Sequence, residues 1–203
     1  MFGYLGQKRE ANFFMNIKAV THRQNPLFIN VHTGVMRGFH TTPMQASSYL
    51  KYKQSVPNLV DVHGLDGAMG ITIASIDKRF PGDGIAAGQQ IAANNRVAKV
   101  TIVVDKDIDV LNVPQVLHAV GTRWQPDPAN LIIPHAFGSV LDPSSPKRGL
   151  ISKIIIDATK QLPEEGGPDK WPAVSRQLLE EDQPGVFDLV DEKWPEYWEG
   201  FGQ

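Results

Sequence analysis

Residues 100–104 read Val-Thr-Ile-Val-Val, and this run decides the class of fold. β-Branched side chains favour strands, and an apolar run without polar alternation is typical of a strand that is covered on both faces. Such strands occur in sheets with parallel pairs, because the connecting helices then lie on both sides of the sheet. The run therefore predicts a central strand of an α/β domain.

Helical and strand patterns alternate on both sides of this run. Pro114 and Gly121 are typical of the start and the end of a helix. Helices are predicted at 43–55, 85–95 and 114–121, and strands at 59–63, 69–76, 131–133 and 150–156. This order predicts an α/β fold in which helices flank a mixed, partly parallel sheet.

The N-terminal part of the chain differs in character. Residues 13–23 alternate apolar and polar side chains, and a second short apolar run follows at 27–32, after Asn25-Pro26. Two runs joined by a short turn predict an antiparallel edge hairpin. We therefore expect residues 1–42 to belong structurally to something other than the α/β domain of residues 43–160.

The C-terminal part, residues 161–203, is predicted to be a linker followed by a helical arm. Residues 163–172 are rich in Pro, Gly and charge, and short helices are expected at 174–181 and 186–198. Trp and Tyr are enriched at protein interfaces, so the arm is suited to pack on a neighbouring subunit. The aromatic residues in question are Trp171, Trp194, Tyr197, Trp198 and Phe201.

Composition excludes several classes of function. Hydrophobic residues make up 41% and charged residues 21% of the chain, as in an average globular protein, and the net charge of −2 favours neither nucleic acid nor an anionic membrane as a partner. The absence of cysteine excludes thiolate nucleophiles, zinc–thiolate sites, iron–sulfur clusters and disulfides. No signal peptide and no apolar run of ~18 residues is visible, so a cytoplasmic location without a membrane span is predicted.

The glycines at 82, 84 and 88 follow a predicted strand and open a predicted helix, as a dinucleotide-binding turn would. Backbone N–H groups at such a helix start hold a pyrophosphate. The spacing differs from that motif, Pro81 interrupts the gap after the strand, and Asp83 would repel a phosphate. A structural turn is the better interpretation, and a dinucleotide-binding oxidoreductase is the weaker one.

Three carboxylates follow the central strand, at Asp105, Asp107 and Asp109. Hard oxygen ligands suit a divalent metal, but Lys106 stands among them, so a solvated turn that caps the next element is the alternative. Arg123, after the helix at 114–121, is suited either to clamp a carboxylate or to bond the carbonyls at the helix end. The residues alone leave both alternatives open.

The six histidines show no HxH or HExxH spacing, so they form no metal motif. His118 falls inside a predicted helix and is expected to be a packing residue. His32, His40 and His135 fall in loops or near strand ends, where site residues of α/β sheets usually lie. The sequence also lacks a G-x-S-x-G elbow and a Walker A loop, so residue chemistry alone shows no complete catalytic set.

Four segments of the chain match the motifs of one enzyme family in the same order. Residues 18–26 (KAVTHRQNP) resemble its A-[IV]-T-[HY]-R-x-x-P segment, and residues 100–110 (VTIVVDKDIDV) resemble its strand with D-x-DIDV. Residues 116–126 (VLHAVGTRWQP) resemble V-x-W-A-x-x-TR-x-x-P, and residues 131–134 (LIIP) resemble the strand that follows. The family is the UbiD family of decarboxylases, which the chain resembles specifically over about residues 13–160.

The resemblance implies a carboxy-lyase that releases CO2 from aromatic or α,β-unsaturated acids. It implies prenylated FMN as the cofactor, with a divalent metal (Mn or Mg) and potassium. Family members are longer, and their flavin-binding split-barrel domain precedes the part matched here. Residues 1–42 would then be the end of that domain and a linker. The chain would close over the active site and mediate a homodimer or larger oligomer. It would need the flavin-binding part as its partner and would be inactive alone. The alternative is a non-catalytic assembly module.

By position in the family, Asn130, Ile132 and the loop with His40 would line the substrate cavity, and no catalytic residue, cofactor ligand or metal ligand is expected here. An Asn at 130, where relatives often have an aromatic residue, suits a polar substituent such as a phenolic hydroxyl. Residues 2–6 (FGYLG) resemble the family's E-G-x-F-G-E segment but lack its acid. Residues 81–84 (PGDG) likewise lack the Lys of its P-G-H-A-K segment.

Overall fold

The structure is a computed structural model, and it describes residues 14–27, 41–65, 68, 70–140, 142–172 and 175–199. The chain divides into two compact units, Met1–Gly167 and Pro168–Gln203. The first unit holds a sheet with its helices, and the second holds two short helices.

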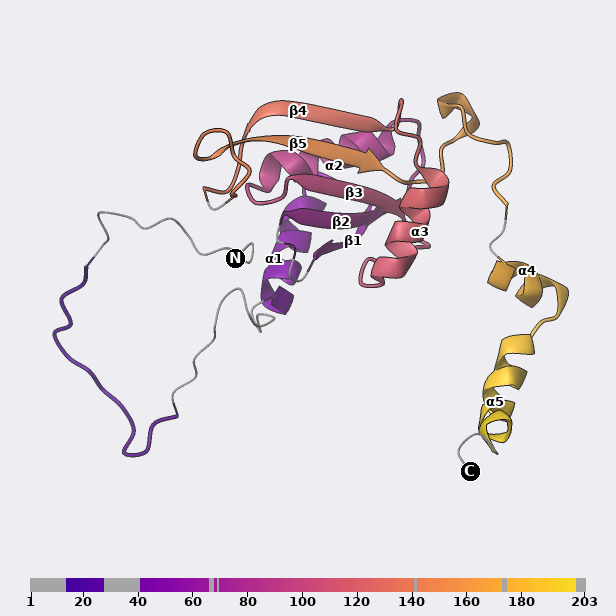
Figure 1. Cartoon of the computed structure of the whole chain (residues 1–203), viewed down its shortest axis with the longest axis horizontal. Coiled ribbons are helices and arrows are strands. Elements are labelled where there is room, and N and C mark those ends of the chain that lie inside the picture. Colours follow the sequence, from indigo (N-terminus) through magenta and orange to yellow (C-terminus); the bar gives the residue numbers. More distant parts are fainter. Residues whose placement is uncertain are drawn as a thin grey trace. The chain divides into compact units, whose positions relative to one another are not determined.

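A five-stranded mixed sheet forms the centre of the first unit (Figure 1). Its strands lie in the spatial order β1-β2-β3-β5-β4, with β2–β3 and β3–β5 parallel and the pair at each edge antiparallel. The strands are β1 (Leu59–Gly64), β2 (Ile71–Ile76), β3 (Val100–Asp105), β4 (Asn130–Phe137) and β5 (Leu150–Asp157). The mixed, partly parallel sheet is confirmed, and the run at 100–104 is its central strand.

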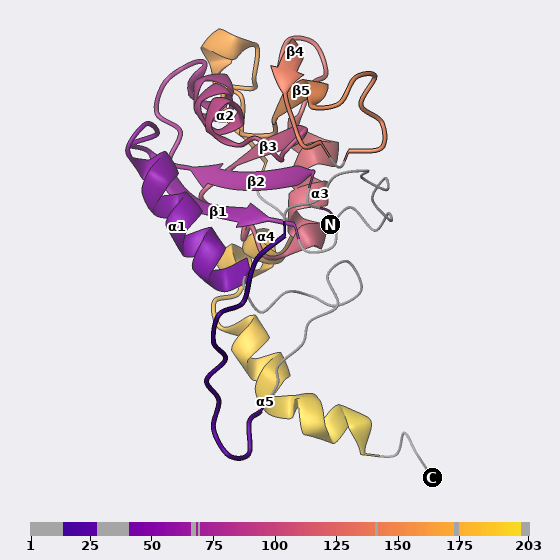
Figure 2. The same ribbon diagram turned by 90° about the vertical axis from the view of Figure 1, so that its left-hand side faces the viewer.

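One face of the sheet is covered by α1 (Thr41–Lys53) and α2 (Asp83–Asn94), which lie side by side against it (Figures 1 and 2). We call it the closed face. Successive residues of a strand point to opposite faces, and the closed-face side chains of the central strands are fully buried. They include Ala74, Val103 and Ile155. The helix α2 approaches closely because it carries Gly88, where a Cβ would overlap the Ile155 side chain.

The opposite face is covered, among the described residues, by α3 (Val113–Arg123) over the carboxyl ends of the strands. Val116 and Ala119 of this helix pack on Ile73 and Val104 of the sheet. The helix begins as the sequence predicts, because the Asn112 side chain accepts the N–H of Gln115 and a proline stands in the first turn. We call this side of the sheet the open face.

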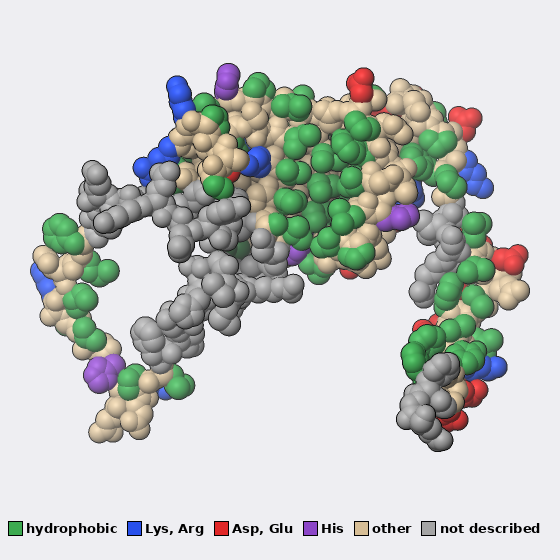
Figure 3. Space-filling view, in the orientation of Figure 1, with side chains coloured by type: hydrophobic (Ala, Val, Ile, Leu, Met, Phe, Trp, Pro, Cys, Tyr) green, Lys and Arg blue, Asp and Glu red, His purple; other side chains and the backbone are tan. Residues whose placement is uncertain are grey.

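A row of apolar side chains on the open face is only partly covered. The strand register aligns Ile71 with Val100, Val100 with Ile154, and Ile154 with Ile132, so the row crosses four strands. Ile132 is 61% exposed, and the other three are half-buried. We call this row the open strip. Figure 3 shows apolar side chains gathered over this face of the sheet.

In the α/β part of the chain the predicted strands and helices are present, and differences are confined to their ends. The helix α3 continues past Gly121 to Arg123, whose side chain has partners at the end of β3. The strand β4 runs on to Phe137, beyond the three residues that the apolar pattern indicates. This continuation passes Pro134, which an edge strand tolerates because one side of its backbone lacks a pairing strand.

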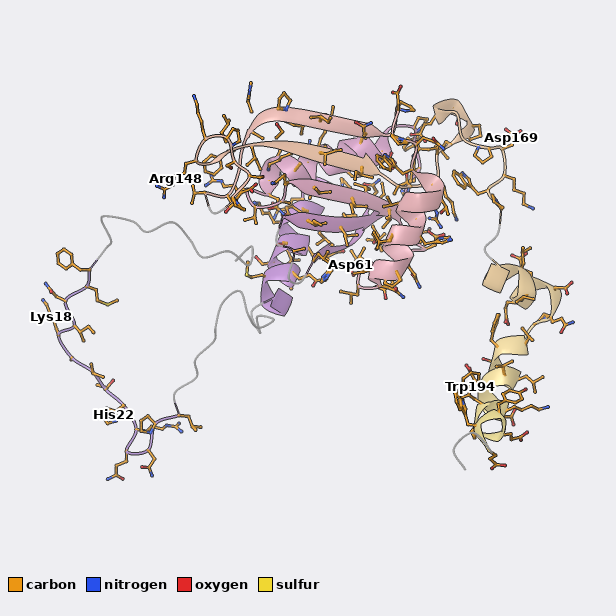
Figure 4. All side chains as sticks on the ribbon, in the orientation of Figure 1. Lys18, His22, Asp61, Arg148, Asp169 and Trp194 are labelled. Atoms are coloured by element: carbon orange, nitrogen blue, oxygen red, sulfur yellow. The ribbon has the colours of Figure 1, made fainter. Side chains whose placement is uncertain are left out.

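The prediction of a first strand in an N-terminal edge hairpin is wrong. Residues 14–27 form neither strand nor helix, and their apolar side chains, such as Phe14 and Ile17, are exposed. Lys18 and His22 project from this segment in Figure 4. Alternation specifies a strand only where another strand pairs with it and a core takes one of its faces, and within the described part of the chain this segment has neither. The second predicted strand, apart from Leu27, lies outside the described residues.

The second unit contains α4 (Ser175–Asp182) and α5 (Val186–Trp198), which contact each other and confirm the two predicted helices. A short 3-10 turn, η1 (Pro163–Glu165), precedes them in the predicted linker. The ring centroids of Trp194, labelled in Figure 4, and Tyr197 lie 6.3 Å apart in an edge-to-face arrangement. Both side chains are nevertheless about half exposed. In the described parts of both units, no helix is long and apolar enough to cross a membrane.

Candidate functional site

A cluster of charged side chains lies at the carboxyl edge of the parallel strands, where ligands of α/β sheets usually bind. Asp105 ends β3, Asp107 follows it, Arg123 ends α3, and Lys160 follows β5. The Arg123 guanidinium donates two hydrogen bonds to Asp107 and one to Asp105, each 2.9 Å long. Lys160 donates to both carboxylates, from its backbone N–H to Asp105 at 2.7 Å and from Nζ to Asp107 at 2.9 Å.

The two carboxylates of this cluster respond differently to their surroundings. Burial raises the pKa of Asp105, and the Lys160 N–H and Arg123 offset it only in part. Burial would also raise the pKa of Asp107, but the hydrogen bonds from Arg123 and Lys160 outweigh it and lower the pKa to about 2. Asp107 is therefore ionised at neutral pH and holds the end of α3 to the sheet through Arg123.

This geometry argues against the metal interpretation of Asp105, Asp107 and Asp109. The first two carboxylates are neutralised by cations of the same chain, and Asp109 accepts the backbone N–H of Leu111. Among the described residues, no three His, Asp or Glu side chains lie close enough together to hold a metal. The solvated, capping turn is not what the structure shows either, because Asn112 caps α3 while Asp105 and Asp107 bind Arg123 and Lys160. Arg123 clamps carboxylates rather than helix-end carbonyls.

A second group of charged side chains, which was not predicted from the sequence, lies beside the Arg123 cluster. The Lys78 side chain, 3% exposed, has its Nζ 2.6 Å from Glu165 Oε2 and 2.9 Å from Thr159 Oγ1. Glu165 also accepts the backbone N–H of Gly82. Burial would raise the pKa of Glu165, but these hydrogen bonds outweigh it and lower the pKa. The pair fixes the turn before α2 to the segment after β5.

The glycines at 82–88 serve packing in this structure. Gly82 has φ +82°, a conformation that suits glycine, and its N–H is used by Glu165. Side chains at Gly84 and Gly88 would overlap Asp157 and Ile155 of β5. Asp83 accepts the backbone N–H groups of Arg79 and Phe80, where a phosphate would otherwise approach. The structural interpretation of this turn is favoured, and the geometry gives no support to a dinucleotide site.

The histidines do not come together at a site. His63 is buried, with Nδ1 3.2 Å from Oε1 of Gln45, whereas His22 and His135 are exposed. The prediction that His118 packs in the core is wrong: it lies on the outer side of α3, because Val116 and Ala119 take the side that faces the sheet. His32 and His40 lie outside the described residues.

Two of the three predicted cavity residues are described, and both lie on the open face. Asn130 pairs with Ile156 and Ile132 with Ile154 across the β4–β5 ladder, so their side chains point to the same side as the open strip. Asn130 is half-buried and Ile132 is largely exposed. Their role in a substrate cavity stays a prediction, as does that of His40, which the structure does not describe.

Sequence reasoning also missed Lys153, which is 5% exposed in the middle of β5. Its ammonium donates to the carbonyls of Ala92 and Asn95 at the end of α2. Burial lowers the pKa of Lys153. A lysine inside the apolar run Ile-Ser-Lys-Ile-Ile-Ile is the signal that could have found it, because an unpaired ammonium is rarely buried in a strand.

Comparison with known families and proteins gives consistent matches. The model of the 3-octaprenyl-4-hydroxybenzoate carboxy-lyase C-terminal domain matches residues 39–158, more than half of the chain. A phenolic acid decarboxylase of Bacillus subtilis is 32% identical over 190 residues, covering 87% of this chain and 39% of the relative. An anhydromevalonate phosphate decarboxylase of Aeropyrum pernix is 36% identical over 122 residues, covering 59% of this chain and 28% of the relative.

Solved structures match in the same way. The closed form of vanillic acid decarboxylase from Sedimentibacter hydroxybenzoicus superposes with a TM-score of 0.64 at 27% identity, over 75% of this chain and 31% of that one. The UbiD-class enzyme HmfF from Pelotomaculum thermopropionicum, in complex with FMN, gives a TM-score of 0.58 at 28% identity, over 72% of this chain and 32% of that one. The chain thus spans less than half of the length of each of these relatives.

Proposed function

Because the chain belongs to the UbiD family, of which it contains the C-terminal domain, we propose that it works as part of a larger decarboxylase that releases CO2 from an aromatic or α,β-unsaturated acid. The observation that carries this proposal is the family match over residues 39–158, on a sheet with the order β1-β2-β3-β5-β4. Relatives named for phenolic and vanillic acids favour an aromatic substrate, and the anhydromevalonate phosphate decarboxylase is the competing precedent.

Prenylated FMN, a divalent metal (Mn or Mg) and potassium are proposed cofactors of that larger enzyme. The described residues do not fit the metal, because Asp105 and Asp107 are already neutralised by Arg123 and Lys160. We therefore assign the cofactor ligands to the flavin-binding part or subunit that accompanies this domain in the family. A cytoplasmic location stays a prediction of the sequence.

The open face is the surface that we propose turns toward the flavin-binding part. It carries Asn130 and Ile132, whose exposure leaves them available to line a cavity, together with the open strip, whose apolar side chains lack a full cover in this chain. Closing over the substrate would bury this strip and exclude water from the site. The loop with His40 is proposed to face the same cavity.

The test is CO2 release by the complete enzyme, prepared in cells that make prenylated FMN and assayed with phenolic and α,β-unsaturated acids. Asn130→Ala is expected to change the KM and the preference among substituted acids, whereas Leu50→Ala, at an exposed position on α1 of the closed face, is expected to change neither. The 203-residue chain alone is expected to be inactive. Tight stoichiometric binding of prenylated FMN by the chain alone would contradict this assignment.

A role in oligomer formation, with or without a part in catalysis, is the second candidate. The observation that favours it is the second unit, where Leu178, Leu189, Trp194 and Trp198 are all about half exposed. Sedimentation of the chain with and without Pro168–Gln203 tests this role, and a cut after Gly167 keeps Glu165 on Lys78. A larger species that reverts to a monomer on truncation supports the role, and a monomer in both cases removes it.

A further inference from the structure

A pocket of about 390 Å³ lies between the end of α2 and the edge strand β4. Its volume falls within the range of small-molecule sites, which begins at ~300 Å³. Small side chains leave this space open: Ala92 and Ala93 line it from the helix, and Ala136 lines it from the strand. A longer side chain at these positions would fill it.

An irregularity in β4 shapes this pocket. Ile133 pairs with Lys153 and Ala136 pairs with Ile151, so β4 has one residue more than β5 over this stretch, which is a β-bulge. His135, within the bulge, has φ +54°, a backbone conformation that a non-glycine residue rarely adopts. Bulges re-aim side chains next to binding sites, and strained residues gather there. Here the bulge directs both Ile133 and Ala136 into the pocket.

The charged residues of the lining are both cations, and no carboxylate occurs among its described lining residues. The Arg96 guanidinium lies over the Phe137 ring, 5.4 Å from its centroid. The Lys153 ammonium donates to two carbonyls at the end of α2, which leaves one of its three N–H donors for a ligand. The pocket therefore combines apolar walls with two positive charges.

We propose that this pocket binds a small carboxylic acid with a flat apolar body, of the size of benzoate. Arg96 would bind the carboxylate with two parallel hydrogen bonds, and Lys153 would supply a third. The ring would lie on Ile133 and the alanines, beside Phe137. Inorganic phosphate would leave the apolar walls uncovered, and a neutral analogue would leave both cations without a partner. The proposal does not depend on the decarboxylase assignment.

The test is a titration of the isotope-labelled 203-residue chain with benzoate, followed by amide chemical shifts. We expect saturable shifts at Ala93, Arg96 and Phe137, with benzamide and inorganic phosphate binding at least fivefold more weakly. Arg96→Gln should weaken benzoate roughly tenfold, because it removes a charge-assisted bidentate contact. Ala93→Leu, at an exposed helix position, should fill the pocket and abolish the shifts without unfolding the chain.

Arg79→Gln is the matched control, because Arg79 is an exposed arginine at the carboxyl edge of the sheet and pairs with Asp77. It should leave benzoate binding unchanged. Benzoate binding that Arg96→Gln and Ala93→Leu leave intact would overturn the proposal. Equal binding of inorganic phosphate would overturn it as well. So would a failure of benzoate to saturate at 10 mM, because weak specific ligands already bind at ~1 mM.

Discussion

The two faces of the sheet differ in how they are covered. On the closed face, α1 and α2 bury apolar side chains of the central strands completely, as at Val103 and Ile155. On the open face, α3 covers the carboxyl ends, and an ionic cluster built on Arg123 holds the end of that helix. The open strip is left half-covered at the amino ends. The closed face is therefore stabilised mainly by packing, with the buried Lys153 bonded to the end of α2, and the open face by packing together with a cluster of ion pairs.

This difference bears on the role of the domain. Apolar side chains that stay half exposed on one face of a sheet mark surfaces that other proteins or domains cover. The chain spans less than half of the length of its relatives, so a large part of the family's structure is available to cover them. On the closed face the apolar side chains of the inner strands are already covered by α1 and α2. Changes on the two faces should therefore have different consequences, which the following substitutions compare.

The largest expected effect is on the closed face. Ile155→Ala should lower the free energy of unfolding by about 3 kcal/mol, because it leaves a cavity in a fully buried site. Ile154→Ala, one residue away on the open strip, should cost about 1 kcal/mol, because that side chain already contacts solvent. Urea unfolding followed by circular dichroism measures both. Equal costs would show that the strip is as well covered as the core.

The next effect concerns the cluster that holds α3. Arg123→Gln should destabilise the chain by about 2 kcal/mol, because it leaves Asp105 and Asp107 close together without their shared cation. This is below the cost of a fully buried pair, since Asp107 is 43% exposed. Hydrogen exchange should show lost protection in α3 and unchanged protection in α2. The control is Arg79→Gln, an exposed pair whose loss should cost no more than ~0.5 kcal/mol. Equal loss of protection in both helices would contradict separate cover of the two faces.

Most strands and helices of the sheet domain could be predicted from the sequence, because their patterns depend on local periodicity. The runs at 71–76 and 100–105 are mostly apolar on both faces, and they are two of the three inner strands. Local patterns do not show how long-range contacts distribute charge. The cluster joins Asp105 to Arg123 and Lys160, which lie 18 and 55 residues further along the chain, and the partners of Lys153 are carbonyls about 60 residues earlier.

The incorrect predictions also arise because local patterns do not show long-range contacts. The alternation at 13–23 resembles a strand, but a strand also needs a pairing partner, and the structure gives none to residues 14–27. His118 has the spacing of a helix residue, but its side of the helix is decided by where Val116 and Ala119 pack. The half-exposure of the open strip could not be predicted at all, because a partly covered apolar run has the same sequence as a buried one.

A smaller effect is expected from pH. The folded-state pKa of Asp107 is lowered to about 2, so ionised Asp107 contributes stability above the unfolded pKa of about 3.8, and this stability is lost as the pH falls toward 2. Because Asp107 is 43% exposed, the contribution is about 1 kcal/mol after solvent screening. Asp105 acts in the opposite sense, because burial raises its pKa and protonation relieves its buried charge.

Urea midpoints measured between pH 5 and pH 2 test this account. The unmodified chain should lose more stability over that range than Asp107→Asn, and the two curves should converge near pH 2. Asp169→Asn is the control, because it removes an exposed carboxylate outside the Arg123 cluster, and it should leave the pH dependence unchanged. Parallel curves for the unmodified chain and Asp107→Asn would mean that Asp107 does not stabilise the helix on the open face.

The smallest expected effect on stability is at the exposed end of the open strip. Ile132→Asp should change the free energy of unfolding by no more than ~0.5 kcal/mol, because the side chain is 61% exposed. Leu50→Asp is matched to it, at 67% exposure on α1 of the closed face. Only Ile132→Asp should weaken association with the flavin-binding part, since burying an unpaired carboxylate is costly and Leu50 lies on the other side of the sheet. If both variants associate like the unmodified chain while remaining equally stable, the open face is not the surface that this part covers.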